Sequence, residues 1–141
     1  MILVDANYLI ALLRPSDELH RRAAAWSRYV RQPLLISEPV LFEAVNALSA
    51  RHLRHGCVQL LQQVKSGDVA SYVRVNSRLF DTAARLYGDR GDKSWSLTDC
   101  VSFVIMRERG IADALTHDHH FEQAGFRALL REDPPTNEVG R

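Results

Sequence analysis

The segment SLTDCVSFVIMRERGIADALTHD, Ser96 to Asp118, contains a helix pattern, a strand pattern and two acidic residues at their ends. Ser96, followed three residues later by Asp99 and then by a mostly apolar run, is a common helix opening. Gly110 ends this helix pattern, and the short run DALT after it is typical of a strand. Asp118 follows that strand after one residue. The segment therefore predicts a helix and a strand that each present a carboxylate at one end.

The N-terminal segment MILVDANYLIALL, residues 1–13, places an acid in the same way. Its first four residues suit a buried strand, Asp5 follows at once, and a helical pattern continues until Arg14 and Pro15 stop it. Three more strands are expected, in LLIS at 34–37, VASYVRV at 69–75 and FRALL at 126–130. Helices are expected over 16–32, 38–56, 57–65, 76–89, 96–110 and 118–125. Strands that alternate with helices predict an α/β fold with a mainly parallel central sheet.

Length and composition indicate one compact domain. The chain has 141 residues, of which 46% are hydrophobic and 25% are charged, enough for a single sizeable core. We expect this domain over 1–131 and a polar, disordered tail over 132–141. No apolar run approaches membrane-spanning length, the two cysteines form no disulfide framework, and the N-terminus lacks a basic leader, so we expect a cytoplasmic protein.

Four acids are the candidate site. In parallel sheets, ligands bind outside the carboxyl ends of the strands, where Asp5 and Asp118 are expected. Asp99 would enter from a helix start, and Glu43 from the flank of the helix at 38–56. Four carboxylates in one cleft repel one another unless a cation binds or a pKa rises. Side chains that would orient them from behind are Asn7, Thr98 and Thr116.

Each acid also has an ordinary structural role, and both interpretations stay open at this point. Asp99 can close a capping box with Ser96, Asp5 can stabilise the turn into the first helix, and Asp118 can cap the helix that follows it. Glu43 can be a solvated surface acid.

The segments MILVDANYLIALL, SEPVLFEAVNAL and DKSWSLTDCVSFVIMRERGIADALTHDHHFEQAGF resemble PIN-domain ribonucleases, most closely the VapC-type toxins of toxin-antitoxin pairs. The resemblance covers nearly the whole chain except the tail. It implies a three-layer α/β/α fold, dependence on Mg2+ or Mn2+, cleavage of structured RNA, a homodimer, and neutralisation by a small cognate antitoxin. Carried over by position, the acidic site of the family falls on Asp5, Glu43, Asp99 and Asp118.

Phosphodiester hydrolysis fits these acids independently. It needs an activated water, a clamp on the phosphate oxygens and stabilisation of the leaving oxygen, and carboxylate-bound Mg2+ supplies all three. We assign Asp5, Asp99 and Asp118 as metal ligands, and Glu43 as a flanking ligand or a group that orients water. His117, His119 and His120 are expected to be surface residues or RNA contacts.

RNA also requires positive charge near the site. Arg51 and Arg54 are expected at the far end of the helix that carries Glu43, about three turns along nearly the same face and roughly 16 Å away. We therefore predict that they contact RNA. Other classes remain open: a DNA nuclease, a PIN nuclease that processes RNA without being a toxin, or a catalytically silent module that binds RNA or protein.

Overall fold

The computed structural model describes residues 1–136, which contain five strands, seven α-helices and two short 3₁₀ turns. In chain order these are β1 Ile2–Val4, α1 Ala6–Leu13, α2 His20–Tyr29, β2 Leu34–Ser37, α3 Glu38–Ala47, a 3₁₀ turn Arg51–Leu53, α4 Arg54–Ser66, β3 Ser71–Val73, α5 Ser77–Asp89, α6 Leu97–Arg109, β4 Asp113–Leu115, α7 His119–Gln123, β5 Arg127–Ala128 and a second 3₁₀ turn Leu129–Arg131.

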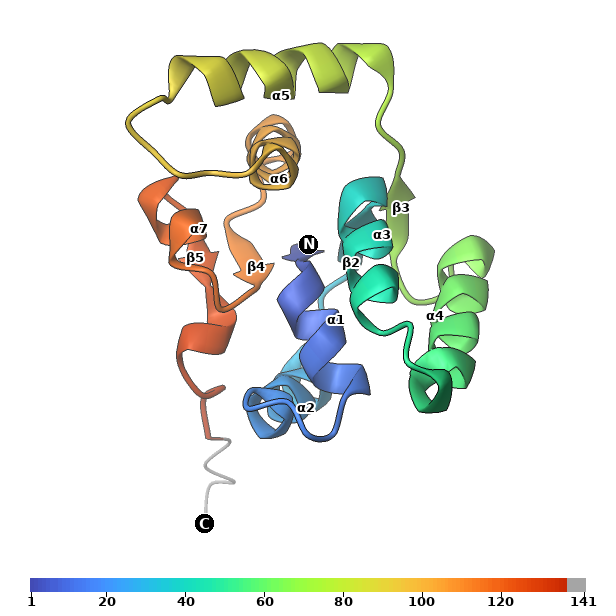
Figure 1. Ribbon diagram of the computed structural model, residues 1–141. Helices are drawn as coiled ribbons and strands as arrows, with labels where there is room; N and C mark the ends of the chain where they lie inside the picture. The colour runs from blue at the N-terminus through green and yellow to red at the C-terminus, as the bar shows by residue number, and fades with distance from the viewer. Residues whose placement is uncertain (137–141) are drawn as a thin grey trace.

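The five strands form one parallel sheet in the order β3-β2-β1-β4-β5. In Figure 1 the strands lie in the middle of the molecule, with α5 and α6 above them and α1 and α2 below. The chain builds outward from β1 through β2 to β3 and then returns to the other side of β1 with β4. This change of direction makes the boundary between β1 and β4 the topological switch point, where α/β sheets bind ligands. Val4 pairs with Leu115 across that boundary.

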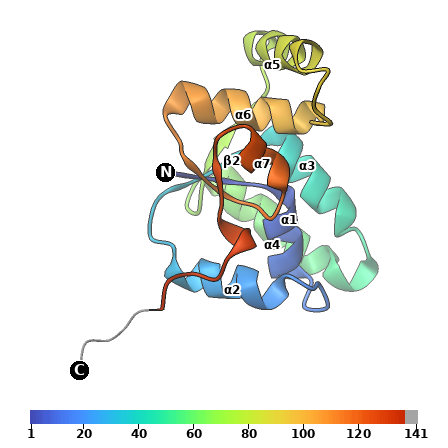
Figure 2. The same ribbon diagram turned by 90° about the vertical axis from the view of Figure 1, so that its left-hand side faces the viewer.

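Two apolar cores cover the two faces of the sheet. Ile2 and Val4 belong to one core with the buried side chains of α1, α2, α3 and α4. Leu3 points to the opposite face and joins a second core with α5, α6 and α7. Figures 1 and 2 show α5 and α6 on one side of the sheet and α1 and α2 on the other. The expected α/β/α fold with a parallel sheet is confirmed.

The expected single helix over 38–56 is wrong. Helix α3 ends at Ala47, with Leu48 as its C-cap, and α4 begins only at Arg54, so Gly56 lies inside α4 and does not end a helix. One straight helix through both segments would be roughly 43 Å long, longer than a small domain is wide. The turn between α3 and α4 instead lets both helices bury apolar side chains in the same core.

Several ends also differ from the sequence-based expectations. Helix α2 begins at His20 and not at 16, because Asp17 forms a turn in which its carboxylate accepts a hydrogen bond from the Leu19 amide. The last strand is two residues long and continues into a 3₁₀ turn. Residues 69–75 contain only three strand residues.

The beginning of the predicted tail contacts the domain. Trp26 Nε1 donates a hydrogen bond to the carbonyl oxygen of Glu132 (2.9 Å), and Arg22 Nε lies 2.9 Å from Asp133 Oδ1. The expectation of disorder beyond 136 lies outside the described residues, and the domain boundary stays a prediction. Within residues 1–136, none of the helices has the length and apolar character needed to cross a membrane.

Candidate active site

Asp5 lies at the carboxyl end of β1, opposite Thr116 at the end of β4. Thr116 Oγ1 donates a hydrogen bond to Asp5 Oδ2 over 2.7 Å, and Asn7 Nδ2 donates to the same oxygen over 3.2 Å. The other oxygen, Oδ1, accepts the Ala6 amide and caps α1 (2.9 Å). The carboxylate of Asp5 is therefore buried and oriented at both oxygens.

Asn7 and Thr116 connect Asp5 to Asp118. Asn7 Nδ2 also donates to Thr116 Oγ1 (3.1 Å), and Asn7 Oδ1 accepts the amide of His117 (3.1 Å). Thr116 Oγ1 in turn accepts the Asp118 amide (3.1 Å). Asp118 is the N-cap of α7, because its Oδ1 accepts the amide of His120 (2.9 Å). Two polar side chains thus hold the ends of β1 and β4 in a fixed relation.

Asp99 closes a full capping box at the start of α6. Ser96 Oγ accepts the Asp99 amide and Asp99 Oδ2 accepts the Ser96 amide, both over 3.0 Å. Asp99 therefore has the helix-capping role that the sequence allowed for it. That role does not exclude a second role, because Asp99 is buried and interacts electrostatically with Asp5, Glu43 and Asp118.

The pKa shifts of three acids record this convergence. The pKa of Asp5 is raised from 3.8 to about 6, mainly by burial, while hydrogen bonds lower it and the charges of Asp99 and Glu43 add to the rise. Burial also raises the pKa of Asp99, with repulsion from Asp118 adding to the effect. The pKa of Glu43, an exposed residue on α3, is raised by partial loss of hydration and then by Asp99 and Asp118. The structure therefore brings together all four acids named from the sequence.

His120 is a site residue that the sequence-based interpretation missed. Its Nδ1 lies 2.8 Å from Asp118 Oδ1 and 3.8 Å from Asp99 Oδ2, with the side chain 19% exposed. Although Nδ1 is close to Asp118, the geometry is not that of a hydrogen bond, and Nδ1 has no hydrogen-bond partner among residues 1–136. Its other nitrogen, Nε2, meets Ser94 Oγ at 3.2 Å. The spacing could have signalled this contact, because an N-cap acid faces the residue two positions later.

The other two histidines lie where they were expected, on the surface. His117 and His119 are exposed, although the His119 ring packs against the His120 ring with centroids 4.3 Å apart. Asp118, His119 and His120 each place one ligand atom within 4.8 Å of the others. A mixed nitrogen and oxygen ligand set is therefore available beside the four carboxylates.

Three further residues named from the sequence lie differently. Of the two threonines predicted to orient the acids, Thr116 is the one whose hydroxyl reaches Asp5, and Thr98 is half-buried in the first turn of α6. The break after α3 separates Arg51 and Arg54 from Glu43, so the single continuous helix on which their predicted placement rested is wrong. Figure 1 shows the start of α4 at the lower right, on the other side of α1 from α7. An RNA contact of these arginines stays a prediction.

Known proteins are similar to this chain over most of its length. The family model of the PIN domain matches residues 2–127. The 23S rRNA-specific endonuclease VapC20 from two strains of Mycobacterium tuberculosis, CDC 1551 / Oshkosh and ATCC 25618 / H37Rv, is 27% identical to this chain over 126 residues. The alignment covers 89% of this chain and 95% of the relative.

A solved structure is similar over the same extent. The crystal structure of Mycobacterium tuberculosis VapC20, described as a Sarcin-Ricin loop cleaving toxin, superposes with a TM-score of 0.81 at 25% sequence identity. The match covers 89% of this chain and 96% of that chain. The likeness therefore includes β1, α3, α6 and β4, the elements that carry or adjoin the four acids.

Proposed function

This chain belongs to the PIN domain family, and from that premise we propose that it is a metal-dependent endoribonuclease and the toxin of a toxin-antitoxin pair. The observation that carries the proposal is the convergence of Asp5, Glu43, Asp99 and Asp118 at the switch point of the sheet. The likeness to a 23S rRNA-specific endonuclease over 89% of the chain supports RNA as the substrate.

The residues present fit a divalent cation. A buried carboxylate with a pKa near 6 beside two other acids is an unfavourable arrangement for a cation-free cleft at neutral pH. A divalent cation would offset the repulsion, and carboxylate oxygens are the ligands that Mg2+ and Mn2+ prefer. We assign Asp5, Asp99 and Asp118 as its ligands. When bound, Mg2+ or Mn2+ would polarise the phosphate oxygens and lower the pKa of a bound water.

The remaining side chains position this set. Thr116 and Asn7 fix the orientation of Asp5 through their hydrogen bonds. Glu43 is the most exposed of the four acids and carries a raised pKa, so it is suited to orient the attacking water and accept its proton. None of these steps requires a covalent intermediate with the protein, and we expect products with a 5'-phosphate and a 3'-hydroxyl.

The substrate class is structured ribosomal RNA in this proposal. The relative whose name specifies 23S rRNA and the structure described as cleaving the sarcin-ricin loop both align with nearly the whole domain. A cognate small antitoxin, a homodimer and a cytoplasmic location stay predictions that follow from the same family resemblance.

The test separates the catalytic role of Asp99 from its capping role. Asp99→Asn should abolish RNA cleavage while the fold persists, because the amide keeps the size and can still accept the Ser96 amide but binds a hard cation poorly. Ser96→Ala is the matched control. It removes only the hydrogen bond that Ser96 Oγ accepts from the Asp99 amide. The change should lower the free energy of unfolding by about 1 kcal/mol while cleavage persists.

Sequencing of cellular RNA ends after controlled expression would measure cleavage and name the substrate. Full cleavage by a folded Asp99→Asn protein would refute the ligand assignment. RNA binding by the wild type without cleavage in Mg2+ or Mn2+ would favour a catalytically silent binding module.

A further inference from the structure

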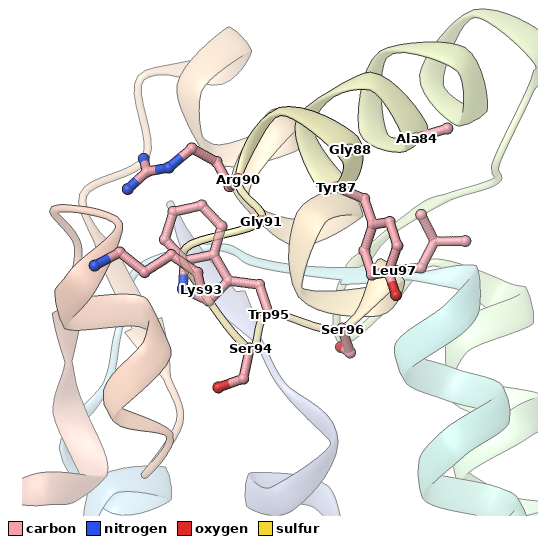
Figure 3. A pocket seen from close by; sticks show the side chains of 10 residues that line it. All are labelled: Ala84, Tyr87, Gly88, Arg90, Gly91, Lys93, Ser94, Trp95, Ser96 and Leu97. Carbon is pink, nitrogen blue, oxygen red and sulfur yellow. The ribbon is translucent and has the colours of Figure 1, made fainter.

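A surface cavity of about 980 Å³ lies between the C-terminal end of α5 and the loop that enters α6. Figure 3 shows Tyr87 and Leu97 on one side of this cavity and Arg90 and Lys93 on the other, with the Ser94 and Ser96 segment between them. None of these residues belongs to the four-acid site, and the volume suits a small ligand or one unit of a polymer.

Hydrogen bonds connect the 94–96 segment of the cavity wall to residues of the candidate active site. Ser94 Oγ meets His120 Nε2 at 3.2 Å, and Ser96 shares the capping box with Asp99. Trp95, between these two serines, donates from Nε1 to Gln123 Oε1 of α7 (3.0 Å). Part of the cavity wall, Ser94 to Ser96, therefore also contacts Asp99 and α7.

One end of the cavity is positive. Arg90 lies 4.8 Å from the centre of the Trp95 ring and bonds Asp92 through two nitrogens, at 2.9 and 3.1 Å. Lys93 Nζ lies 3.7 Å from Asp92 Oδ2, the oxygen that Arg90 Nη2 also contacts. Two cations share one carboxylate, so this end keeps a net positive charge. Arg90 is held by its contacts with the Trp95 ring and Asp92. Lys93, whose side chain is 30% exposed, makes the longer contact with Asp92 and is the more adaptable donor.

The other end presents an aromatic ring to solvent. The Tyr87 side chain is 55% exposed, and Leu97, beside it in Figure 3, is 40% exposed. An exposed ring next to positive charge is the combination with which proteins bind unpaired nucleotides, because the ring stacks on the base and the cation contacts the phosphate. Figure 3 shows both ends within one cavity.

We propose that this cavity seats an unpaired RNA nucleotide adjacent to the scissile phosphate. Its base stacks on Tyr87 and Leu97, and its phosphate contacts Lys93. The inference rests on the proposed endoribonuclease function. It adds that the RNA binds with one base extruded from its structure. The four acids support hydrolysis of the phosphodiester bond, and the cavity selects which bond of the RNA is hydrolysed.

The test is RNA binding in Ca2+, a hard cation that can occupy a carboxylate site, with cleavage measured separately in Mg2+. The probe is a synthetic RNA hairpin with 2-aminopurine in its loop, whose fluorescence falls when the base stacks. Tyr87→Leu should weaken binding about tenfold and remove the quenching, as expected for loss of one base-aromatic contact. Tyr87→Phe should restore both. Lys93→Gln should lower the slope of log affinity against log salt by roughly 0.7 to 0.9.

Two matched controls separate the cavity from the surface around it. Phe80→Leu changes an aromatic residue that is 51% exposed on the same helix, seven residues before Tyr87. Lys65→Gln makes the lysine change on α4. Both should bind RNA as the wild type does. Unchanged RNA affinity in Tyr87→Leu would overturn the proposal. If Tyr87→Leu and Phe80→Leu both also altered the sedimentation of the protein, this face would be assigned to a protein contact.

The outcomes for the cavity and for the proposed function are distinct. If the wild type cleaves RNA while Tyr87→Leu and Lys93→Gln bind the hairpin normally, the cavity proposal fails and the function stands. If the wild type binds the hairpin through Tyr87 and Lys93 but cleaves no RNA, the proposed function fails, and with it the role of the cavity in selecting a cleavage position, while nucleotide binding in the cavity stands. If the wild type binds no RNA, both fail.

Discussion

Asp5, Asp99 and Asp118 each stabilise the start of a helix with one carboxylate oxygen. Asp5 Oδ1 caps α1, Asp99 Oδ2 closes the capping box of α6, and Asp118 Oδ1 caps α7. Such bonds hold a side chain in one orientation before any ligand arrives. The structural role and the proposed ligand role of these acids are therefore compatible, because the cap fixes the direction in which the rest of the carboxylate faces its neighbours.

The raised pKa of Asp5 predicts a dependence of stability on pH. The group has a pKa of about 6 in the folded chain against its ordinary value of 3.8, so folding takes up a proton between these pH values. Without metal, ionised Asp5 lowers the free energy of unfolding. This loss of stability is complete above pH 6 and absent below pH 4. Asp5→Asn should therefore raise the free energy of unfolding at pH 7.5 in EDTA by up to about 3 kcal/mol, and the gain should vanish toward pH 4.

Urea unfolding across this pH range would measure the effect. Saturating Mg2+ should reverse it, because the ion would bind the wild-type carboxylate and not the amide. A metal-free Asp5→Asn protein that is less stable than the wild type at pH 7.5 would contradict the prediction.

At the scale of elements, α7 is a five-residue helix that depends on two contacts. Phe121 is fully buried and meets the Phe103 ring of α6 edge-on, with centroids 5.0 Å apart. Trp95 Nε1 donates to Gln123 at the end of the helix. Isolated helices of this length do not form in water, so packing on α6 determines where Asp118 and His120 lie.

Truncation of this anchor should disturb the site as well as the fold. Phe121→Ala should lower the free energy of unfolding by about 3 to 5 kcal/mol through the cavity that it leaves. Phe121→Leu, with a smaller loss of about 1 kcal/mol, should keep the fold while weakening cation binding. Urea unfolding and a Mn2+ titration would measure the two effects. Phe80→Ala, an exposed change on α5, should alter neither, and an equal loss of stability in Phe80→Ala would contradict the packing argument.

At the scale of the whole molecule, the strand order places β1 beside β4, and the helices α3 and α6 bring Glu43 and Asp99 to the same edge. Acids from four separate parts of the chain meet only in the folded state. A cation that binds them therefore stabilises the fold by mass action, by about 2.7 kcal/mol at one hundred times its dissociation constant.

Mg2+ or Mn2+ at millimolar concentration should accordingly raise the melting temperature of the wild type by roughly 5 to 10 °C. Asp118→Asn should show a smaller shift. Asp113→Asn is the matched control, because Asp113 lies at the opposite end of β4. Calorimetry would measure all three proteins. A wild-type melting temperature that does not move in either ion would mean that the four acids form no cation site.

The sequence by itself determined the fold class, the family and the set of four acids. Strand patterns, helix caps and stop signals are local, because the hydrogen bonds behind them join residues a few positions apart. The Ser96 capping box could be predicted for this reason, and it is present. Asp5 and Asp118 could be placed at one edge because the carboxyl ends of parallel strands coincide.

Only the tertiary structure decided which of these residues meet and what surrounds them. The break between α3 and α4 ends the helix of Glu43 before Arg51 and Arg54, and it lets both helices bury apolar side chains in one core. The burial of His120 and the cavity beside Tyr87 depend in the same way on the packing of α7 and α5 against α6. Such contacts join residues distant in the chain, and their free energy depends on the whole arrangement, which no local pattern in the sequence records.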